Sequence, residues 1–354
     1  MMPPMPREAP LDLCAPPDLG VLAVQDNELL GFTVWTECRP GLGEDAEPLM
    51  LYHRPSMAGL LGVLDGSGGS GSGSAWTDPA GVPHSGAWVG SRLARLGAES
   101  WFATQFEGTV ESPRFTGPDD LAEQLRTVLR ILPDPSRSKI QGDMLRRLPT
   151  TMALIRYHHL PQGLLWAQSL WAGDSRGYCL RPDQGLQPLT RDHTVETDAL
   201  AQLTQDPPVT NVLCADRRFR VERHHLRMLL PVVLLCATDG FFGYLQTPAD
   251  FERLLLDTLA SADDPQHWGE LLTAQVKGYT ADDASLSLVC LGYRDFAQLR
   301  DSFAVRTEDV RRLLAGRPDP GRQQHLDWRQ RMWDLYRSGY EAMMPPVSTE
   351  GSRR

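Results

Sequence analysis

Acidic residues stand at the borders of apolar segments at four places in this sequence. These residues are the clearest candidates for a chemical role. Asp65 directly follows an apolar run, Asp239 follows another after Thr238, and each aspartate precedes a glycine. Asp174 follows a third apolar run, and Asp282, with its neighbour Asp283, precedes a fourth. Because rigid elements fix the positions of side chains at strand ends, these carboxylates can meet at one rim of a sheet.

Several carboxylates at one site repel one another, and divalent cations are the usual compensation. No Cys or His stands near these aspartates at metal-ligand spacing. Ligands that are all oxygen select hard cations such as Mg²⁺ or Mn²⁺ over zinc. A single Asp-Gly pair is weak evidence, since this dipeptide is common in turns. Two such pairs after strands, with Asp174 and Asp282 at other strand edges, predict a divalent-cation site.

The elements that must position these residues are short apolar strands and amphipathic helices. Strand patterns cover 21–35, 57–64, 151–158, 164–171, 177–180, 231–236 and 286–291. Helical patterns cover 85–102, 119–132, 249–260, 267–277 and the chain beyond 294. Strands and helices do not alternate as βαβ units. The sequence therefore predicts an α+β fold, a four-layer α-β-β-α sandwich with two mainly antiparallel sheets flanked by helices.

A glycine- and serine-rich tract, DGSGGSGSGS, begins at Asp65. Its composition alone fits a flexible linker. Its position between a buried strand and a helix instead favours a turn whose backbone approaches a ligand closely.

The order of the motifs resembles that of the PP2C family of metal-dependent serine/threonine protein phosphatases, in its bacterial form. The matching segments are GEDA (43–46), VLDGSGG (63–69), PTTMA (149–153), WAGDSRGYCLR (171–181), LTRDHT (189–194), CATDGFFGY (236–244) and DDASLSLV (282–289). The resemblance implies a phosphatase domain over 21–293 with a flap at about 195–227. A flexible N-terminal arm (1–20) precedes it, and a helical C-terminal extension with a loose tail (294–354) follows.

The resemblance also implies how two metal ions are held. Asp65 bridges both ions, and the backbone carbonyl of Gly66 binds the second. Glu44 holds that second ion through water. Asp239 and Asp282 hold the first ion.

The resemblance further implies that Asp174 helps to bind a weaker third ion, so two or three Mn²⁺ or Mg²⁺ ions are expected. Arg39 is the implied phosphate-binding arginine, although RPGLGED (39–45) has one extra residue and a glycine in place of the family's asparagine. Arg54 is a fallback that no motif supports. Ser67 stands where eukaryotic members have a candidate acid histidine, and Asp283 stands where asparagine is common.

The chemistry that follows from this resemblance is hydrolysis by a water that the two cations share. The cations lower the pKa of that water and offset charge on the phosphoryl oxygens. Asp65, Asp239 and Arg39 are then the expected catalytic residues. The leaving alkoxide takes its proton from a metal-bound water or from a histidine. His193 is the histidine nearest a motif, and a structural role is favoured for it.

Two other segments each leave two interpretations open. Positive side chains gather within 195–227, where they either dock anionic groups of a phosphoprotein or form a solvated hairpin face, which is favoured. The C-terminal extension carries an apolar stripe that includes Trp328, Trp333, Tyr336 and Tyr340. Such a stripe either packs on the parent domain, which is favoured, or forms a partner or regulatory surface.

The bulk composition excludes some classes of function. The 354 residues have a formal net charge of −10, which does not support the positively charged surface that nucleic-acid binding needs. The longest apolar stretch, 228–237, contains a proline and is too short to span a membrane. The six cysteines form no CxxC pair, and Cys179, Cys236 and Cys290 lie in strand-like runs. A cytoplasmic protein with reduced, buried cysteines is expected.

The leading functional hypothesis is a phosphatase that acts on phosphoserine and phosphothreonine in proteins. Its expected partners are a phosphorylated protein substrate and a serine/threonine kinase. One alternative is a non-catalytic sensor or scaffold that binds a phosphoprotein or ligand on the same fold. Another is a phosphatase of small molecules. The complete set of metal-binding aspartates favours an enzyme.

Overall fold

The computed structural model describes residues 20–26, 29–107, 115–132, 146–205, 207–319, 321 and 323–347. All but the last residue of the predicted N-terminal arm, and the predicted loose tail from residue 348, lie outside the described residues. In these ranges two antiparallel sheets pack face to face. One has six strands in the order β1-β2-β13-β12-β9-β10, and the other has five in the order β11-β8-β7-β4-β3.

The strands of the six-stranded sheet are β1 (Val21–Gln25), β2 (Leu30–Thr36), β9 (Arg176–Arg181), β10 (Gly185–Pro188), β12 (Val232–Ala237) and β13 (Ala284–Leu291). Those of the five-stranded sheet are β3 (Leu49–His53), β4 (Ala58–Gly66), β7 (Thr150–Leu160), β8 (Leu164–Ala172) and β11 (Glu222–Leu229). A separate hairpin consists of β5 (Ser74–Thr77) and β6 (Pro83–Ser85).

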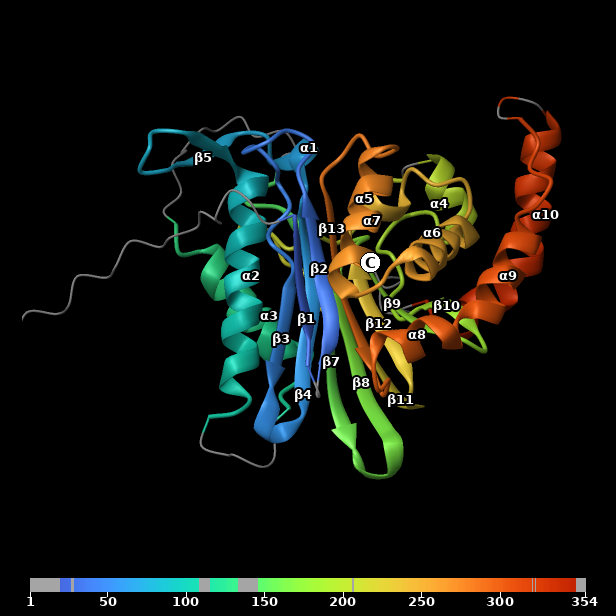
Figure 1. Ribbon diagram of the computed structural model, residues 1–354. Helices are drawn as coiled ribbons and strands as arrows, with labels where there is room; N and C mark the ends of the chain where they lie inside the picture. The colour runs from blue at the N-terminus through green and yellow to red at the C-terminus, as the bar shows by residue number, and fades with distance from the viewer. Residues whose placement is uncertain are drawn as a thin grey trace, which may run out of the picture.

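Helices cover the outer face of each sheet (Figure 1). On the five-stranded sheet lie α2 (Gly86–Thr104) and α3 (Pro118–Leu129). On the six-stranded sheet lie α6 (Pro248–Ser261) and α7 (Pro265–Lys277). The remaining helices are α1 (Gly68–Gly71), α4 (Ala199–Gln205), α5 (Asp239–Phe242), α8 (Phe296–Ser302), α9 (Ala304–Leu313) and α10 (Gln323–Tyr340). The predicted four-layer α-β-β-α sandwich is confirmed.

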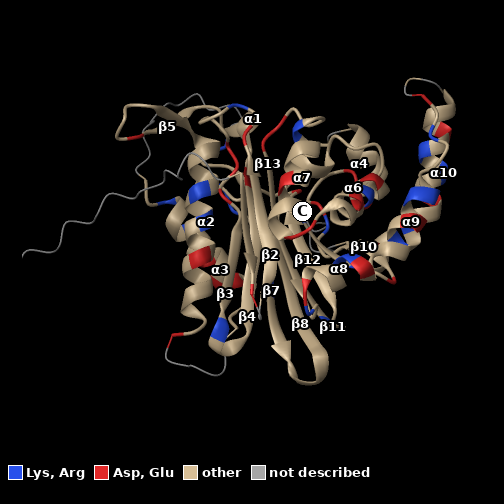
Figure 2. Cartoon of the chain, viewed as in Figure 1, with Lys and Arg blue, Asp and Glu red and all other residues tan. Residues whose placement is uncertain are grey.

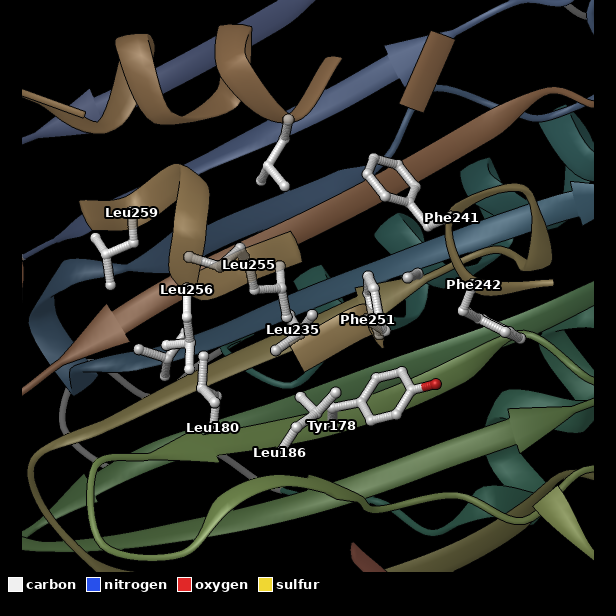
Figure 3. Close-up of a cluster of buried hydrophobic side chains, with 14 of the residues drawn as sticks. Tyr178, Leu180, Leu186, Leu235, Phe241, Phe242, Phe251, Leu255, Leu256 and Leu259 are labelled. Atoms are coloured by element: carbon white, nitrogen blue, oxygen red, sulfur yellow. The ribbon is translucent and has the colours of Figure 1, made fainter. Parts of the chain in front are cut away.

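Three clusters of buried apolar side chains correspond to the three interfaces between these layers. The alternation along β12 shows why, since Val232 and Leu234 lie between the sheets whereas Val233 and Leu235 face the helices. Figure 3 shows the outer cluster, where Leu235 lies near the apolar side chains of α6. Strands that are buried on both faces have continuous apolar sequences, and for this reason they could be predicted from the sequence.

The C-terminal helices contribute to the same outer cluster. Trp328, Trp333, Tyr336 and Tyr340 are all buried in it. The Tyr336 hydroxyl donates a hydrogen bond to the carboxylate of Glu252, which lies on α6 and is fully buried. The aromatic stripe of the extension therefore packs on the parent fold, as the favoured interpretation predicts.

The structure corrects one sequence-based boundary. Residues 222–227 were predicted to belong to the flap, but they form most of β11, which pairs with β8 at the edge of the five-stranded sheet. Alternate side chains of β11 are exposed, so its composition is polar and its strand character is weak in the sequence. None of the helices in the described ranges has the length and apolar character that crossing a bilayer requires.

Candidate metal centre

The antiparallel register brings the predicted acidic residues to one end of the sandwich. Asp65, near the end of β4, pairs with Thr151 at the start of β7. Ala172, at the end of β8, pairs with Met152, so the β8–β9 turn that carries Asp174 lies at the same end. In the other sheet Ala237, at the end of β12, pairs with Leu286 near the start of β13. Asp239 and Asp282 flank these two strands at that end.

One cavity of about 390 Å³ collects these side chains. Figure 2 shows acidic segments near α1 and the start of β13. The cavity is lined by Glu44, Asp65, Gly66, Ser67, Gly68, Gly69, Thr151, Asp174, Val209, Asp239, Asp282 and Asp283. All six residues that the resemblance assigns to the metals are therefore neighbours in the structure, although they span 239 positions of the sequence from first to last, counting both ends.

Hydrogen bonds hold Glu44 at the cavity. The Ser85 hydroxyl donates to the Glu44 carboxylate, and the backbone N–H of Glu44 donates to the Asp283 carboxylate over 2.6 Å. The second oxygen of Asp283 accepts from the backbone N–H of Cys38 over 2.7 Å. Asp283 therefore fixes both ends of the loop that leads into Glu44, which gives the extra carboxylate beside Asp282 a positional role.

Two glycines are needed because other groups approach their backbone closely. A Cβ atom on Gly66 would lie 2.6 Å from the carbonyl oxygen of Glu44 and 2.7 Å from that of Ala87. A Cβ atom on Gly68 would collide with the carboxylate of Glu44. The glycine-rich tract is thus an ordered turn beside the acidic cavity, as its position in the sequence favoured.

The electrostatics of the cavity disfavour charged carboxylates on their own. Burial, reinforced by Asp45 and Asp239, raises the pKa of Asp65 well above its usual value. Burial and then the charge of Asp239 raise the pKa of Asp174 to about 8. Burial also raises the pKa of Glu44, and the neighbouring aspartates add to the shift. The same repulsion would be relieved by bound cations.

The donor set fits hard divalent cations. It contains carboxylate oxygens and the Gly66 backbone, with no sulfur or imidazole among the lining residues. No group of three or more His, Cys, Asp or Glu side chains in the described part of the chain is already arranged to hold a metal ion. In donor chemistry and in location, the residues that line the cavity fit such ions.

The predicted phosphate-binding arginines do not line this cavity. Arg39 is exposed in the turn before Glu44, where its carbonyl accepts from the backbone N–H of Leu42. Its role stays a prediction. Arg54 lies before the first residue of β4, Ala58. The strand from Ala58 to Asp65 is roughly 23 Å long, so Arg54 lies at the opposite end of β4 from Asp65. It pairs there with Asp26, so the fallback is wrong by position.

His193 has a structural task. Its Nδ1 accepts a hydrogen bond from the backbone N–H of Gly173 over 3.0 Å, next to Asp174. The side-chain amide of Asn211 also lies 3.0 Å from that nitrogen. Burial, with a smaller contribution from Arg220, lowers the pKa of His193 to about 4. A neutral imidazole that holds the Asp174 turn agrees with the structural role that the sequence favoured.

Two residues of the centre were not identified from the sequence. Asp45 is buried behind the cavity, where the Thr238 hydroxyl donates to its carboxylate over 3.1 Å. The sequence feature that could have identified Asp45 is its position directly after Glu44. Ser85 caps the N-terminus of α2 by accepting from the backbone N–H of Trp88, and it also binds Glu44. In the sequence Ser85 is the first residue of the helical pattern 85–102, a position where serine is a common N-cap.

The structure thus defines an α-β-β-α sandwich with an acidic cavity at one end of its sheets. Neither a family model nor a curated protein matches the chain. Solved structures do match it, and they include bacterial serine/threonine phosphatases of the PPM/PP2C type, the family that the motifs resemble.

The serine/threonine phosphatase PstP/Ppp of Mycobacterium tuberculosis is 15% identical over 75% of this chain and 99% of its own, with a TM-score of 0.49. Stp1 of Staphylococcus aureus is 16% identical over 75% and 96%, with a TM-score of 0.49. PppA of Pseudomonas aeruginosa, described as a key regulatory component of the T6SS, is 19% identical over 75% and 98%, with a TM-score of 0.46.

Proposed function

We propose that this protein is a divalent-cation-dependent phosphatase of the PP2C type that hydrolyses phosphoserine and phosphothreonine in proteins. The observation that carries the proposal is the meeting of Glu44, Asp65, Asp174, Asp239 and Asp282 at one cavity. These carboxylates lie at strand ends, which fix their positions, and they repel one another. Such a set is suited to Mg²⁺ or Mn²⁺.

The fold holds the residues of the site in fixed positions. Asp65 and Gly66 project from the end of a buried strand, so their positions are set by the sheet. The hydroxyls of Thr151 and Ser175 lie 2.6 Å apart and link the start of β7 to the turn that carries Asp174. When bound, divalent cations supply an activated water and offset charge on the phosphoryl group. Arg39 is the proposed contact to the remaining phosphoryl oxygens.

Manganese-dependent hydrolysis of p-nitrophenyl phosphate and of a phosphothreonine peptide tests this proposal. We expect activity with Mn²⁺ that EDTA removes. Asp239→Asn should lower kcat/KM at least about 100-fold, because it removes an ionic metal ligand. Asp301→Asn, an exposed carboxylate on α8, is the matched control and should behave as wild type. Full activity in Asp239→Asn would show that the site is assigned to the wrong residues.

A non-catalytic phosphoprotein-binding role is the second candidate. Among the described residues no arginine or lysine lines the acidic cavity, so the arginine contact that hydrolysis would use is not in place there. If the wild-type protein binds Mn²⁺ and a phosphopeptide but hydrolyses neither substrate, the binding role replaces the enzymatic one. A panel of phosphorylated metabolites, compared with phosphopeptides by kcat/KM, tests the remaining alternative of a small-molecule phosphatase.

A further inference from the structure

The short helix α4, near the start of the predicted flap, lies beside the metal centre. A hollow of about 220 Å³ adjoins the acidic cavity and shares Asp174, Asp239 and Asp282 with it. On the flap side this hollow is lined by Leu203 of α4 and by Pro207, just beyond α4 in the sequence. A phosphoprotein whose phosphate lies at the metal centre therefore meets this part of the flap.

The position of α4 depends on its neighbours. The helix has only seven residues, and helices shorter than about 12 residues are marginal on their own. Its buried residues are Ala199 and Leu200, which belong to the outer apolar cluster, and Leu203 packs against that cluster in part. Contacts that α4 makes outside itself must therefore fix it beside the metal centre.

Asp198 joins α4 to α10 through its two carboxylate oxygens. Oδ1 caps α4, because it accepts from the backbone N–H groups of Leu200 and Ala201, each over 3.0 Å. Oδ2 accepts from the indole Nε1–H of Trp333 over 3.1 Å and lies 3.0 Å from Nη1 of Arg337. One side chain thus both begins the flap helix and ties it to the C-terminal extension.

α10 is itself firmly placed on the sandwich. Trp333 is buried, and the Tyr336 hydroxyl donates to the buried carboxylate of Glu252 on α6. The side-chain amide of Gln187, on β10, donates to the carbonyl of Gly339 over 2.9 Å. The extension is therefore a fixed element against which α4 can be held.

The opposite side of α4 is linked to the metal centre through Gln202. Its carbonyl oxygen accepts from Nη2 of Arg176 over 3.0 Å, and Arg176 begins β9, two residues after Asp174. Its amide nitrogen donates to the hydroxyl of Thr194 over 3.0 Å. A continuous series of contacts thus runs from α10 through Asp198 and α4 to the strand that follows the Asp174 turn.

We propose that Asp198 is a positioning residue of the metal centre. Held by Trp333 and Arg337, it fixes α4 beside the acidic cavity, so the C-terminal extension controls how tightly the protein binds a phosphoprotein substrate. Hydrogen bonds to a carboxylate are stronger than neutral ones, which suits this contact to holding a short helix. In its kinetic consequence this inference rests on the proposed phosphatase function, whereas the position of α4 is tested without turnover.

Asp198→Ser separates the two tasks of this carboxylate. Serine is as good an N-cap as aspartate, so the cap of α4 is kept while both contacts to α10 are lost. We expect the backbone amides of α4 to exchange with deuterium about fivefold faster than in wild type. The amides of β12 and β13 should exchange at the wild-type rate. Hydrogen-exchange mass spectrometry measures both.

Substrate binding gives a second readout. In Asp198→Ser the KM for a phosphothreonine peptide should rise about fivefold, and kcat/KM for the peptide should fall by that factor relative to kcat/KM for p-nitrophenyl phosphate. A merely structural defect lowers the folded fraction, which affects both substrates alike. The ratio of the two kcat/KM values would then stay as in wild type.

Two arginines of α10 assign the effect to the contact with Asp198. Arg337→Gln removes one of the two donors and should change both readouts in the same direction, by about twofold. Arg331→Gln is the matched control, because Arg331 is an exposed arginine of the same helix and is not a partner of Asp198 in the described ranges. Arg337→Gln should add nothing to Asp198→Ser, since both act on one contact.

Three outcomes would overturn the proposal. Wild-type exchange of α4 in Asp198→Ser would mean that α4 holds its position without α10. A wild-type ratio of peptide to p-nitrophenyl phosphate in that variant would mean that the position of α4 does not affect the substrate. An equal change in Arg331→Gln would mean that the charge of α10, and not its contact with Asp198, is responsible.

Failure of the phosphatase proposal has a different signature. A wild-type protein that hydrolyses neither substrate with Mn²⁺ contradicts the enzymatic function only. The exchange of α4 still tests its attachment to α10, and fluorescence anisotropy with a labelled phosphothreonine peptide then measures Kd in place of KM. A Kd that rises about fivefold in Asp198→Ser would support the positioning role, and an unchanged Kd would overturn it.

Discussion

Ser85 illustrates how one side chain serves both the fold and the metal centre. Its oxygen accepts from the backbone N–H of Trp88 at the start of α2, and its hydroxyl donates to Glu44. Ser85→Ala should cost about 1 kcal/mol of stability through the lost cap. It should also weaken Mn²⁺ binding about tenfold, because Glu44 loses the partner that orients it. Chemical denaturation and calorimetric titration with Mn²⁺ measure the two effects separately.

Another helix cap provides the control for Ser85→Ala. Asp264 caps α7 by accepting from the backbone N–H of His267 over 2.8 Å, and it does not line the acidic cavity. Asp264→Ala should lower stability by a similar amount and leave the Kd for Mn²⁺ as in wild type. Equal Mn²⁺ affinities in Ser85→Ala and wild type would show that the hydroxyl only caps the helix.

His193 makes a pH-dependent contribution to stability whose sign follows from its environment. The folded protein holds its pKa at about 4, below the value of about 6.5 expected in the unfolded chain. The unfolded state therefore binds more protons between these values, so this stability is complete above pH 6.5 and is lost as the pH falls to 4. The full effect is about 3 kcal/mol.

His193→Asn isolates this contribution, since the Asn oxygen can accept from Gly173 without titrating. We expect wild type to lose about 3 kcal/mol more than the variant between pH 7 and pH 4 in urea denaturation with EDTA present. The buried carboxylates of the metal centre have raised pKa values and change stability in the opposite direction, but they are common to both proteins. Parallel stability curves for the two proteins would contradict the buried, neutral imidazole.

At the scale of elements, the turn after β4 shows why its glycines stand where they do. A Cβ on Gly68 would collide with the Glu44 carboxylate, whereas a Cβ on the adjacent Gly69 meets nothing within 4 Å. Gly68→Ala should therefore displace Glu44 and weaken Mn²⁺ binding about tenfold. Gly69→Ala should keep the wild-type affinity. If calorimetric titration gives the same Kd for both variants, the close approach of Glu44 to this turn is not needed for binding.

The elements that the sequence revealed are those whose residues carry a local signal. β4 and β12 are buried on both faces. β4 ends at Asp65-Gly66, and β12 is followed by Thr238-Asp239-Gly240, so both strands and their acidic ends were predictable. β11 was not, because it is an edge strand with alternate exposed polar residues. The hairpin β5–β6 was missed because each strand is short and lies in a polar, proline-containing stretch.

At the scale of the whole molecule, the sequence could not supply contacts between distant segments. The hydrogen bonds that the Asp283 carboxylate accepts from the backbone N–H groups of Cys38 and Glu44 join segments about 240 positions apart, and no local pattern marks them. The Ser85–Glu44 contact is of the same kind.

The C-terminal extension provides the last prediction, which concerns how many units unfold. Arg306 on α9 binds the fully buried Glu252 of α6 through two hydrogen bonds of 2.6 and 2.9 Å. Arg306→Ala leaves that carboxylate buried, with the Tyr336 hydroxyl as its remaining partner among the described residues. We expect a loss of about 3 kcal/mol, because an uncompensated buried charge is strongly unfavourable. Arg311→Ala, on the same helix, breaks only exposed pairs with Asp257 and Glu308 and should cost less than about 1 kcal/mol.

The form of the unfolding transition then tests the predicted boundary at residue 293. Trp328 and Trp333 of the extension and Trp268 of α7 belong to one buried cluster, so tryptophan fluorescence reports on both sides of that boundary. If the extension is one cooperative unit with the sandwich, Arg306→Ala shifts a single transition monitored by fluorescence and by circular dichroism. Two transitions, with only one of them shifted by Arg306→Ala, would mean that the extension unfolds separately. The buried Glu252 network favours the single transition, since α6 cannot keep its carboxylate compensated once α9 has detached.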